Sequence, residues 1–112
     1  HAGYSPWDGN LDLQSTDNLL WIRGEFHNSI TPVDDKRTVV FGHSTMPGFG
    51  LKQTEVWESE AELKNSRPAA IGIDSCCYAG KDPQLTALNL QTGDIVKQRV
   101  LPRKKTTTEM EI

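Results

Sequence analysis

The sequence lacks long hydrophobic runs, has few cysteines and carries no excess of positive charge. Its apolar runs are far shorter than the ~20 residues that a transmembrane helix needs, and no signal peptide is visible. A net charge of −3 and a pI of about 5.5 argue against a surface for nucleic acid or anionic membranes. We therefore expect neither nucleic acid nor a membrane as a partner.

The two cysteines, Cys76 and Cys77, are adjacent in the chain. Neighbouring Cα atoms lie ~3.8 Å apart, which is below the usual span of a disulfide, so we expect no ordinary disulfide between them. Two free thiols are typical of a reducing compartment and predict a cytoplasmic location. No C-x-x-C motif or second Cys/His pair supports a zinc site. We therefore expect both cysteines to be small buried hydrophobic residues rather than soft metal ligands.

The length of 112 residues, with 36% hydrophobic residues, allows one small domain with a modest core. The chain begins at His1 rather than at methionine. We therefore expect a processed product or a fragment of a longer protein.

Two segments show patterns that are typical of helices. Apolar residues recur at helical spacing after Thr16 and Asp17, either of which is a candidate N-cap, and the predicted helix ends near His27. His27 is interpreted as a favourable charge for the helix dipole. The charged segment 53–65 predicts a second, solvated helix, which Pro68 ends.

Four segments predict strands, and together with the helices they indicate an α/β fold. The β-branched and aromatic run at 39–41 is typical of a buried strand, and a second short strand is expected at 69–74. Segments 85–90 and 95–101 flank a turn signal at 91–94, which predicts a terminal β-hairpin.

Two residues stand out as candidates for chemistry. His43 follows Gly42 at the carboxyl end of the strand at 39–41, where α/β sheets bind ligands, and histidine is a common metal ligand. The alternative is a histidine that hydrogen-bonds a loop. Arg23 lies among apolar residues of the first predicted helix, where a surface arginine with a buried stem is the alternative. A triad of Ser44, a histidine and Asp74 lacks the G-x-S-x-G elbow.

Several motifs occur in a fixed order along the chain: HAG at 1–3, LLWIRGEF at 19–26, VVFGHST at 39–45, IDSCCYAG at 73–80, and LTAL with TGD at 85–94. Taken together, they resemble consecutive motifs of the calcineurin-like metallophosphoesterases. The branch they resemble most is the bacterial-type phosphoprotein phosphatases, with the symmetrical dinucleoside tetraphosphatases beside them. The resemblance covers most of residues 1–101, less so residues 50–68.

The resemblance implies roles for three residues. His1 matches the histidine of the family's H-[AG]-G motif and His43 that of its G-H-[ST] motif, so both are implied metal ligands. Arg23 matches an arginine that grips substrate phosphate, where a planar guanidinium serves better than a lysine. The implied cofactors are two divalent metal ions of the manganese, iron or zinc class, which generate a nucleophile near neutral pH. No catalytic residue is implied within this chain.

The family's GDxHG, GDxVDRG and GNHE motifs are absent from the sequence, and Cys76 stands where the family has glycine. We therefore expect residues 1–101 to be the C-terminal half of a two-sheet α/β sandwich, followed by a flexible tail at 102–112. The implied partners are the missing N-terminal half and a phosphoprotein or small phosphorylated substrate.

The expected activity of the parent enzyme is phosphomonoester hydrolysis, on phosphoserine or phosphothreonine, and the 112-residue chain alone is expected to be inactive. Two alternatives stay open. One is a symmetrical dinucleoside tetraphosphatase, and the other is a catalytically dead binding module that keeps the shell of a phosphatase.

Overall fold

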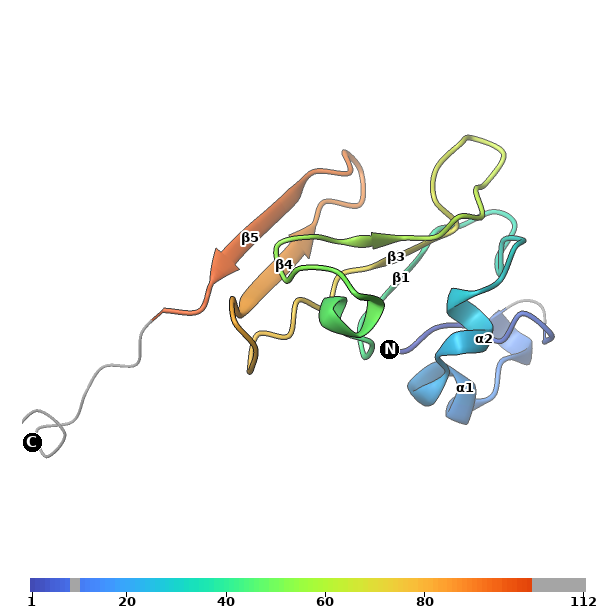
Figure 1. The fold of residues 1–112 in the computed structure, drawn as a ribbon. Coiled ribbons are helices and arrows are strands. Elements are labelled where there is room, and N and C mark those ends of the chain that lie inside the picture. Colours follow the sequence, from blue (N-terminus) through green and yellow to red (C-terminus); the bar gives the residue numbers. More distant parts are fainter. Residues whose placement is uncertain (9–10, 102–112) are drawn as a thin grey trace, which may run out of the picture.

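The computed structural model describes residues 1–8 and 11–101. It combines short helices with two small β-sheets in a mixed α/β arrangement (Figure 1). The elements in chain order are η1 (Leu11–Leu13), α1 (Thr16–Trp21), α2 (Gly24–His27), β1 (Val39–Phe41), η2 (Met46–Phe49), β2 (Trp57–Glu58), β3 (Ala70–Gly72), β4 (Gln84–Leu88) and β5 (Ile95–Arg99).

The first sheet has three strands in the order β1-β3-β2. β1 and β3 run parallel, with Val40 opposite Ile71, and β2 pairs antiparallel to the other edge of β3. The predicted strands at 39–41 and 69–74 are confirmed, although β3 itself is shorter than predicted. Parallel strands carry their loops at the same edge, so the residues after β1 and after β3 meet there.

The main core lies between the helices and one face of this sheet. Phe41 is its centre: its ring meets Phe26 edge-on with the centroids 4.9 Å apart, and it meets Trp57 at 5.6 Å. Edge-to-face pairs of this kind add to the stability that apolar burial provides. The buried members of this cluster are Ala2, Ile22, Phe26, Phe41 and Ala70.

The second sheet is the β4–β5 hairpin, which confirms the predicted hairpin. It lies on the opposite side of the three-stranded sheet from the helices (Figure 1). Its inward face is mixed, because Gln84 and Thr86 are buried there while Leu88 and Ile95 face the three-stranded sheet. On the outer face, Leu85 and Val96 are 63% and 67% exposed. The exposed apolar side chains on the outer face depart from the polar solvent face that is usual for a half-buried antiparallel sheet.

The first predicted helix is two helices in the structure. α1 ends at Trp21 and α2 begins at Gly24, with Arg23 in a non-helical conformation between them. Glycine at the break disfavours continuation of the helix. Neither Thr16 nor Asp17 is the N-cap, because the Ser15 hydroxyl accepts the backbone N–H of Asn18 at 3.1 Å.

The helix predicted at 53–65 is wrong. Its centre pairs as β2 with the free edge of β3, because that edge offers backbone donors and acceptors that need partners. The expectation of two buried cysteines is half wrong: both thiols are free, but Cys76 is buried and Cys77 exposed. The predicted tail at 102–112 lies outside the described residues. Within the described part of the chain, no helix combines the length and apolarity needed to cross a membrane.

Candidate functional site

The N-terminal segment runs beside the carboxyl end of β1. The carbonyl of His1 accepts the backbone N–H of Gly42 at 2.9 Å, and the N–H of Ala2 donates to the carbonyl of Leu19 at 2.7 Å. Gly3 follows with φ +146°, and a Cβ there would overlap the ring of Phe26. A glycine at this position therefore lets the chain cross the core tightly enough to place His1 next to the β1 loop.

His43 is the first residue after Gly42 and adopts φ +65°, which is uncommon for a residue with a side chain. Its ring centroid lies 5.0 Å from that of His1 and 5.7 Å from that of Trp21. Its Nε2 is buried and has no hydrogen-bond partner in residues 1–8 and 11–101. An unpaired buried nitrogen costs free energy, so it marks a position where a ligand or metal could supply the missing partner.

Arg23 meets the same loop from the helical side. Its Nη1 donates a hydrogen bond of 2.9 Å to the hydroxyl of Ser44, which is buried. The helix break is what places this arginine, since Arg23 occupies the non-helical position between α1 and α2. Arg23 is an exposed residue, and the guanidinium has further N–H donors that could bind an anion.

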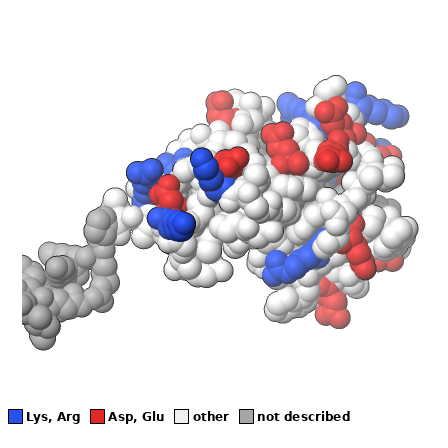
Figure 2. Space-filling view, viewed as in Figure 1, with Lys and Arg blue, Asp and Glu red and all other residues white. Residues whose placement is uncertain are grey.

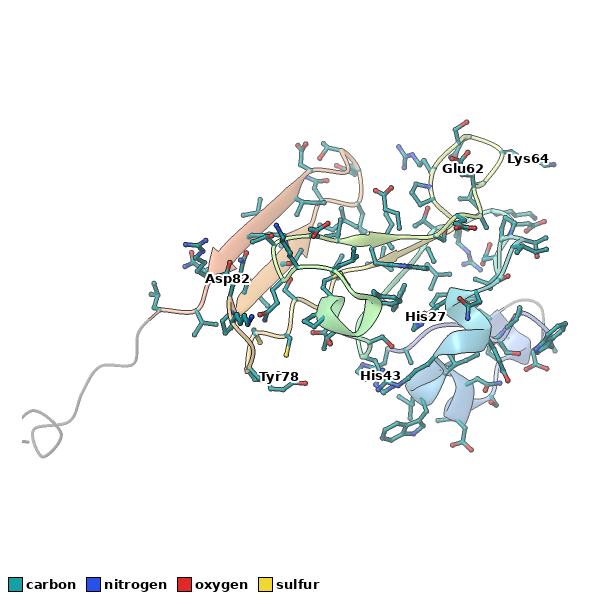
Figure 3. The ribbon with its side chains drawn as sticks, viewed as in Figure 1. His27, His43, Glu62, Lys64, Tyr78 and Asp82 are labelled. Carbon is teal, nitrogen blue, oxygen red and sulfur yellow. The ribbon has the colours of Figure 1, made fainter. Side chains whose placement is uncertain are left out.

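The predicted residues Arg23 and His43 line one cavity of about 390 Å³, although His1 does not. Figure 3 shows His27, His43 and Tyr78, three of the residues that line it. The full lining consists of Arg23, His27, His43, Ser44, Thr45, Gly48, Phe49 and Tyr78. Two aromatic residues, one guanidinium and two imidazoles can accommodate an anionic group that carries an organic substituent.

His27 has more than the helix-dipole role that the sequence predicts. Its ring stacks on Phe41 with the centroids 5.3 Å apart and meets Phe49 edge-on at 4.6 Å. Burial, followed by the charges of Arg23 and His43, lowers the pKa of His27 below its ordinary value. The imidazole is therefore neutral at pH 7 and forms an uncharged part of the cavity wall.

The sequence missed His27 and Tyr78 as cavity residues. Tyr78 lies in the loop after β3, within the IDSCCYAG motif, but the resemblance assigns it no role and it follows no helical or strand periodicity. His27 carried a signal, because a histidine at the end of an apolar stripe can be buried with that stripe.

The fit of the residues to a metal is partial. His1 and His43 are adjacent imidazoles, and the unpaired Nε2 of His43 suits a ligand. Within the described residues, however, no group of three or more His, Cys, Asp or Glu side chains is placed to hold a metal ion. His1 and His43 could therefore hold a metal only together with ligands from outside the described residues.

A larger cavity, of about 520 Å³, lies away from these residues. It separates the three-stranded sheet from the hairpin, with Val40 and Ile71 on one side and Leu88 and Ile95 on the other. None of the three predicted site residues lines it. Because apolar side chains of the sheet and the hairpin face each other across it, this cavity is better explained as loose packing between two layers than as a catalytic cavity.

The structure therefore brings His1, Arg23 and His43 to one edge of the sheet, from three segments of the chain. Charged side chains of both signs are interspersed on the face shown in Figure 2. Comparison of the chain with protein-family models, with curated proteins and with solved structures gives no match.

Proposed function

We propose that this chain is the C-terminal half of a metal-dependent phosphatase domain with the calcineurin-like fold. The parent enzyme would hydrolyse phosphomonoesters, with phosphoserine and phosphothreonine as the favoured substrates. The observation that carries the proposal is the convergence of His1, Arg23 and His43 at the carboxyl ends of β1 and β3. These are the residues to which the sequence resemblance assigns metal and phosphate binding.

The arrangement of Arg23 supports a phosphate-binding role. Its Nη1 is held by the buried hydroxyl of Ser44, which restricts the guanidinium of this otherwise exposed residue. A guanidinium held in this way binds phosphate oxygens with less loss of side-chain entropy than a free one. His43 and Ser44 line the same cavity as Arg23, so a phosphate bound by Arg23 there would lie close to both residues.

His1 and His43 would hold one metal together with ligands from the missing half. When bound, the two metals supply charge stabilisation and a nucleophile near neutral pH. The chain's own residues orient the substrate: Arg23 binds the phosphate, and Phe49 and the neutral His27 line the cavity beside it. The position of the hairpin against the face of the three-stranded sheet that the helices leave uncovered supports the second layer that a two-sheet sandwich requires.

A catalytically dead binding module is the second candidate. It is favoured by the absence of three metal-binding side chains in one place among the described residues. Hydrolysis of dinucleoside polyphosphates is the remaining alternative within the phosphatase class. All three share the proposed anion site at Arg23. The two enzymes generate a nucleophile there and differ in their substrates, whereas the binding module generates none.

The test uses the complete protein and measures p-nitrophenyl phosphate hydrolysis with manganese. His1→Ala and His43→Ala should each remove most activity, and excess manganese should restore part of it, because weak metal binding yields to mass action. Arg23→Ala should lose a charge-assisted contact to the phosphate that is worth ~1.5–3 kcal/mol. Added manganese should not restore the activity of this variant. Arg67→Ala is the matched control, since Arg67 is exposed and lines the other cavity.

Near-parental rates in both histidine variants without added metal would show that neither histidine is a metal ligand. A complete protein that hydrolyses no phosphate ester but still binds inorganic phosphate through Arg23 would establish the binding module instead. Comparison of phosphoserine peptides with dinucleoside tetraphosphates then separates the two enzymatic alternatives.

A further inference from the structure

Gln53 is a buried amide in the segment between η2 and β2, and it is bound on both ends of its side chain. Its Oε1 accepts the backbone N–H of Asp82 at 2.9 Å. Its Nε2 donates to three backbone carbonyls at 2.9–3.0 Å, those of Ser75, Cys76 and Ala79. One side chain therefore holds the beginning, the middle and the end of a single loop, residues 75–82.

This loop closes directly over the amide of Gln53. Gly80 has φ +95°, and a Cβ there would lie 2.9 Å from Cδ and Nε2 of Gln53. Such a distance is well below van der Waals contact, and a positive φ is itself strained for other residues. The close approach depends on glycine at this position and on the length of the glutamine side chain.

Lys97 of β5 holds the same loop from the hairpin side. Its ammonium donates to the hydroxyl of Thr86 at 2.7 Å, to that of Ser75 at 3.3 Å, and to the carbonyl of Gln53 at 3.3 Å. Burial lowers the pKa of Lys97. The loop is thus tied to the hairpin and to the η2–β2 segment at once, which limits its freedom to move.

Tyr78 is the residue that this loop presents to the cavity. It is 81% exposed in the structure, yet it lines the same cavity as Arg23 and His43 (Figure 3). Interaction with the thiol of Cys76 is the first cause that raises the pKa of Tyr78. A phenol is neutral at pH 7 with or without this shift. An exposed aromatic ring with a neutral hydroxyl can pack against the organic part of a ligand and donate a hydrogen bond to it.

We propose that Gln53 is a positioning residue, which fixes the loop of residues 75–82 so that Tyr78 forms a wall of the cavity that holds Arg23 and His43. Tyr78 then contacts the organic part of a phosphate ester while Arg23 binds the phosphate. The proposal rests on the proposed function for the identity of that ligand. The fixing of the loop by Gln53 stands apart from it and is tested separately.

The first experiment measures thiol reactivity towards 5,5′-dithiobis(2-nitrobenzoate) in the folded chain. The exposed Cys77 should react fast and the buried Cys76 slowly. Gln53→Met keeps the side-chain length but removes every hydrogen bond to the loop, so the second thiol should react at least about tenfold faster. Gln98→Met, on the exposed β5 strand, is the matched control and should keep the slow phase. A slow Cys76 in Gln53→Met would overturn the positioning role.

The second experiment measures p-nitrophenyl phosphate kinetics in the complete protein. Gln53→Met and Tyr78→Ala should each raise KM by about tenfold and change kcat by less than about twofold, because both alter ground-state binding rather than the reacting groups. A KM equal to the parental value in both variants would overturn the role of Tyr78.

If the parental protein hydrolyses nothing, the proposed function fails, and phenyl phosphate binding, measured by calorimetry, replaces the kinetics. The dissociation constant should then rise by about tenfold in both variants, and an unchanged constant would overturn the role of Tyr78.

Discussion

The guanidinium of Arg23 donates a hydrogen bond of 2.9 Å to the hydroxyl of Ser44, across 21 positions of sequence. This contact joins the break between α1 and α2 to the loop after β1. Because Ser44 is buried and Arg23 is exposed, the hydroxyl is a fixed point that restricts a mobile side chain. The contact therefore restrains the arginine of the proposed anion site at little cost in charge burial.

Arg23→Ala, Ser44→Ala and the double variant should show coupling in phosphate binding. A net hydrogen bond of this kind contributes ~0.5–1.5 kcal/mol, so Ser44→Ala should weaken phosphate binding severalfold when Arg23 is present. It should have no further effect when Arg23 is absent. Calorimetric titration with inorganic phosphate provides the four dissociation constants of the cycle. Strictly additive losses would show that the two side chains act independently.

Gly3→Ala should strongly destabilise the chain. The added Cβ would overlap the ring of Phe26 in the main core, and overpacking of this kind costs ~1–3 kcal/mol in addition to backbone strain. Gly50→Ala is the matched control: Gly50 also has a positive φ, of +74°, but nothing lies within 4 Å of its added Cβ. Urea denaturation should place the midpoint of Gly3→Ala well below that of Gly50→Ala, and equal midpoints would contradict the packing of Gly3 on Phe26.

Asp34 should make the free energy of unfolding depend on pH in the acid range. Burial raises the pKa of its carboxyl, but hydrogen bonds from the N–H groups of Lys36 and Arg37, and the Arg37 side chain, outweigh that effect and lower it overall. A carboxyl whose pKa is lowered by folding stabilises the folded state at pH values above its unfolded-state pKa of ~3.9. This contribution is lost as the pH falls through the pKa of the folded state.

Asp34→Asn should therefore be less stable than the parental chain at pH 7, with the difference shrinking below about pH 4. Asp35→Asn, at the exposed neighbouring carboxylate, should leave the free energy of unfolding nearly unchanged across this range. Denaturant titrations at several pH values measure both variants, and an undiminished difference at pH 3 would exclude the linkage.

The 112-residue chain alone should not hydrolyse p-nitrophenyl phosphate, even with added manganese. Two histidines leave most coordination positions of two metals unfilled, and incompletely held metals do not produce a nucleophile near neutral pH. The measurement is turnover by highly purified chain, with His43→Ala as the control for a contaminating phosphatase. Turnover that disappears in His43→Ala would contradict the assignment of the chain as half a domain.

The outer face of the hairpin should promote self-association of the isolated chain. Leu85 and Val96 are exposed on this face, and both outer strand edges of the hairpin are unpaired within the described residues. Leu85→Glu with Val96→Lys should reduce the associated fraction, as measured by analytical ultracentrifugation, with little change in the free energy of unfolding. A monodisperse parental chain with a sharp cooperative melt would contradict this and favour an independent binding module.

Local sequence was sufficient for the elements whose signals are short-range. The run Val39–Phe41 formed a strand because β-branched and aromatic side chains suit a buried sheet, and the turn at 91–94 paired its flanking strands as a hairpin. The end of this predicted strand also placed His43 at the carboxyl edge of the sheet. These parts of the fold required no long-range information.

Tertiary structure determined the secondary structure of the segments whose local patterns were ambiguous. Residues 53–65 carry few apolar side chains, so the need of β3 for a partner outweighed helix propensity and produced β2. The helix at 16–27 broke at Arg23, where glycine follows and where Ser44 binds the side chain.

The cavity likewise required folding, because Arg23, His43 and Tyr78 come from three separate segments of the chain, and Tyr78 enters on a loop that Gln53 holds. Composition and spacing determined which elements form, whereas contacts between segments distant in sequence determined which side chains share a site.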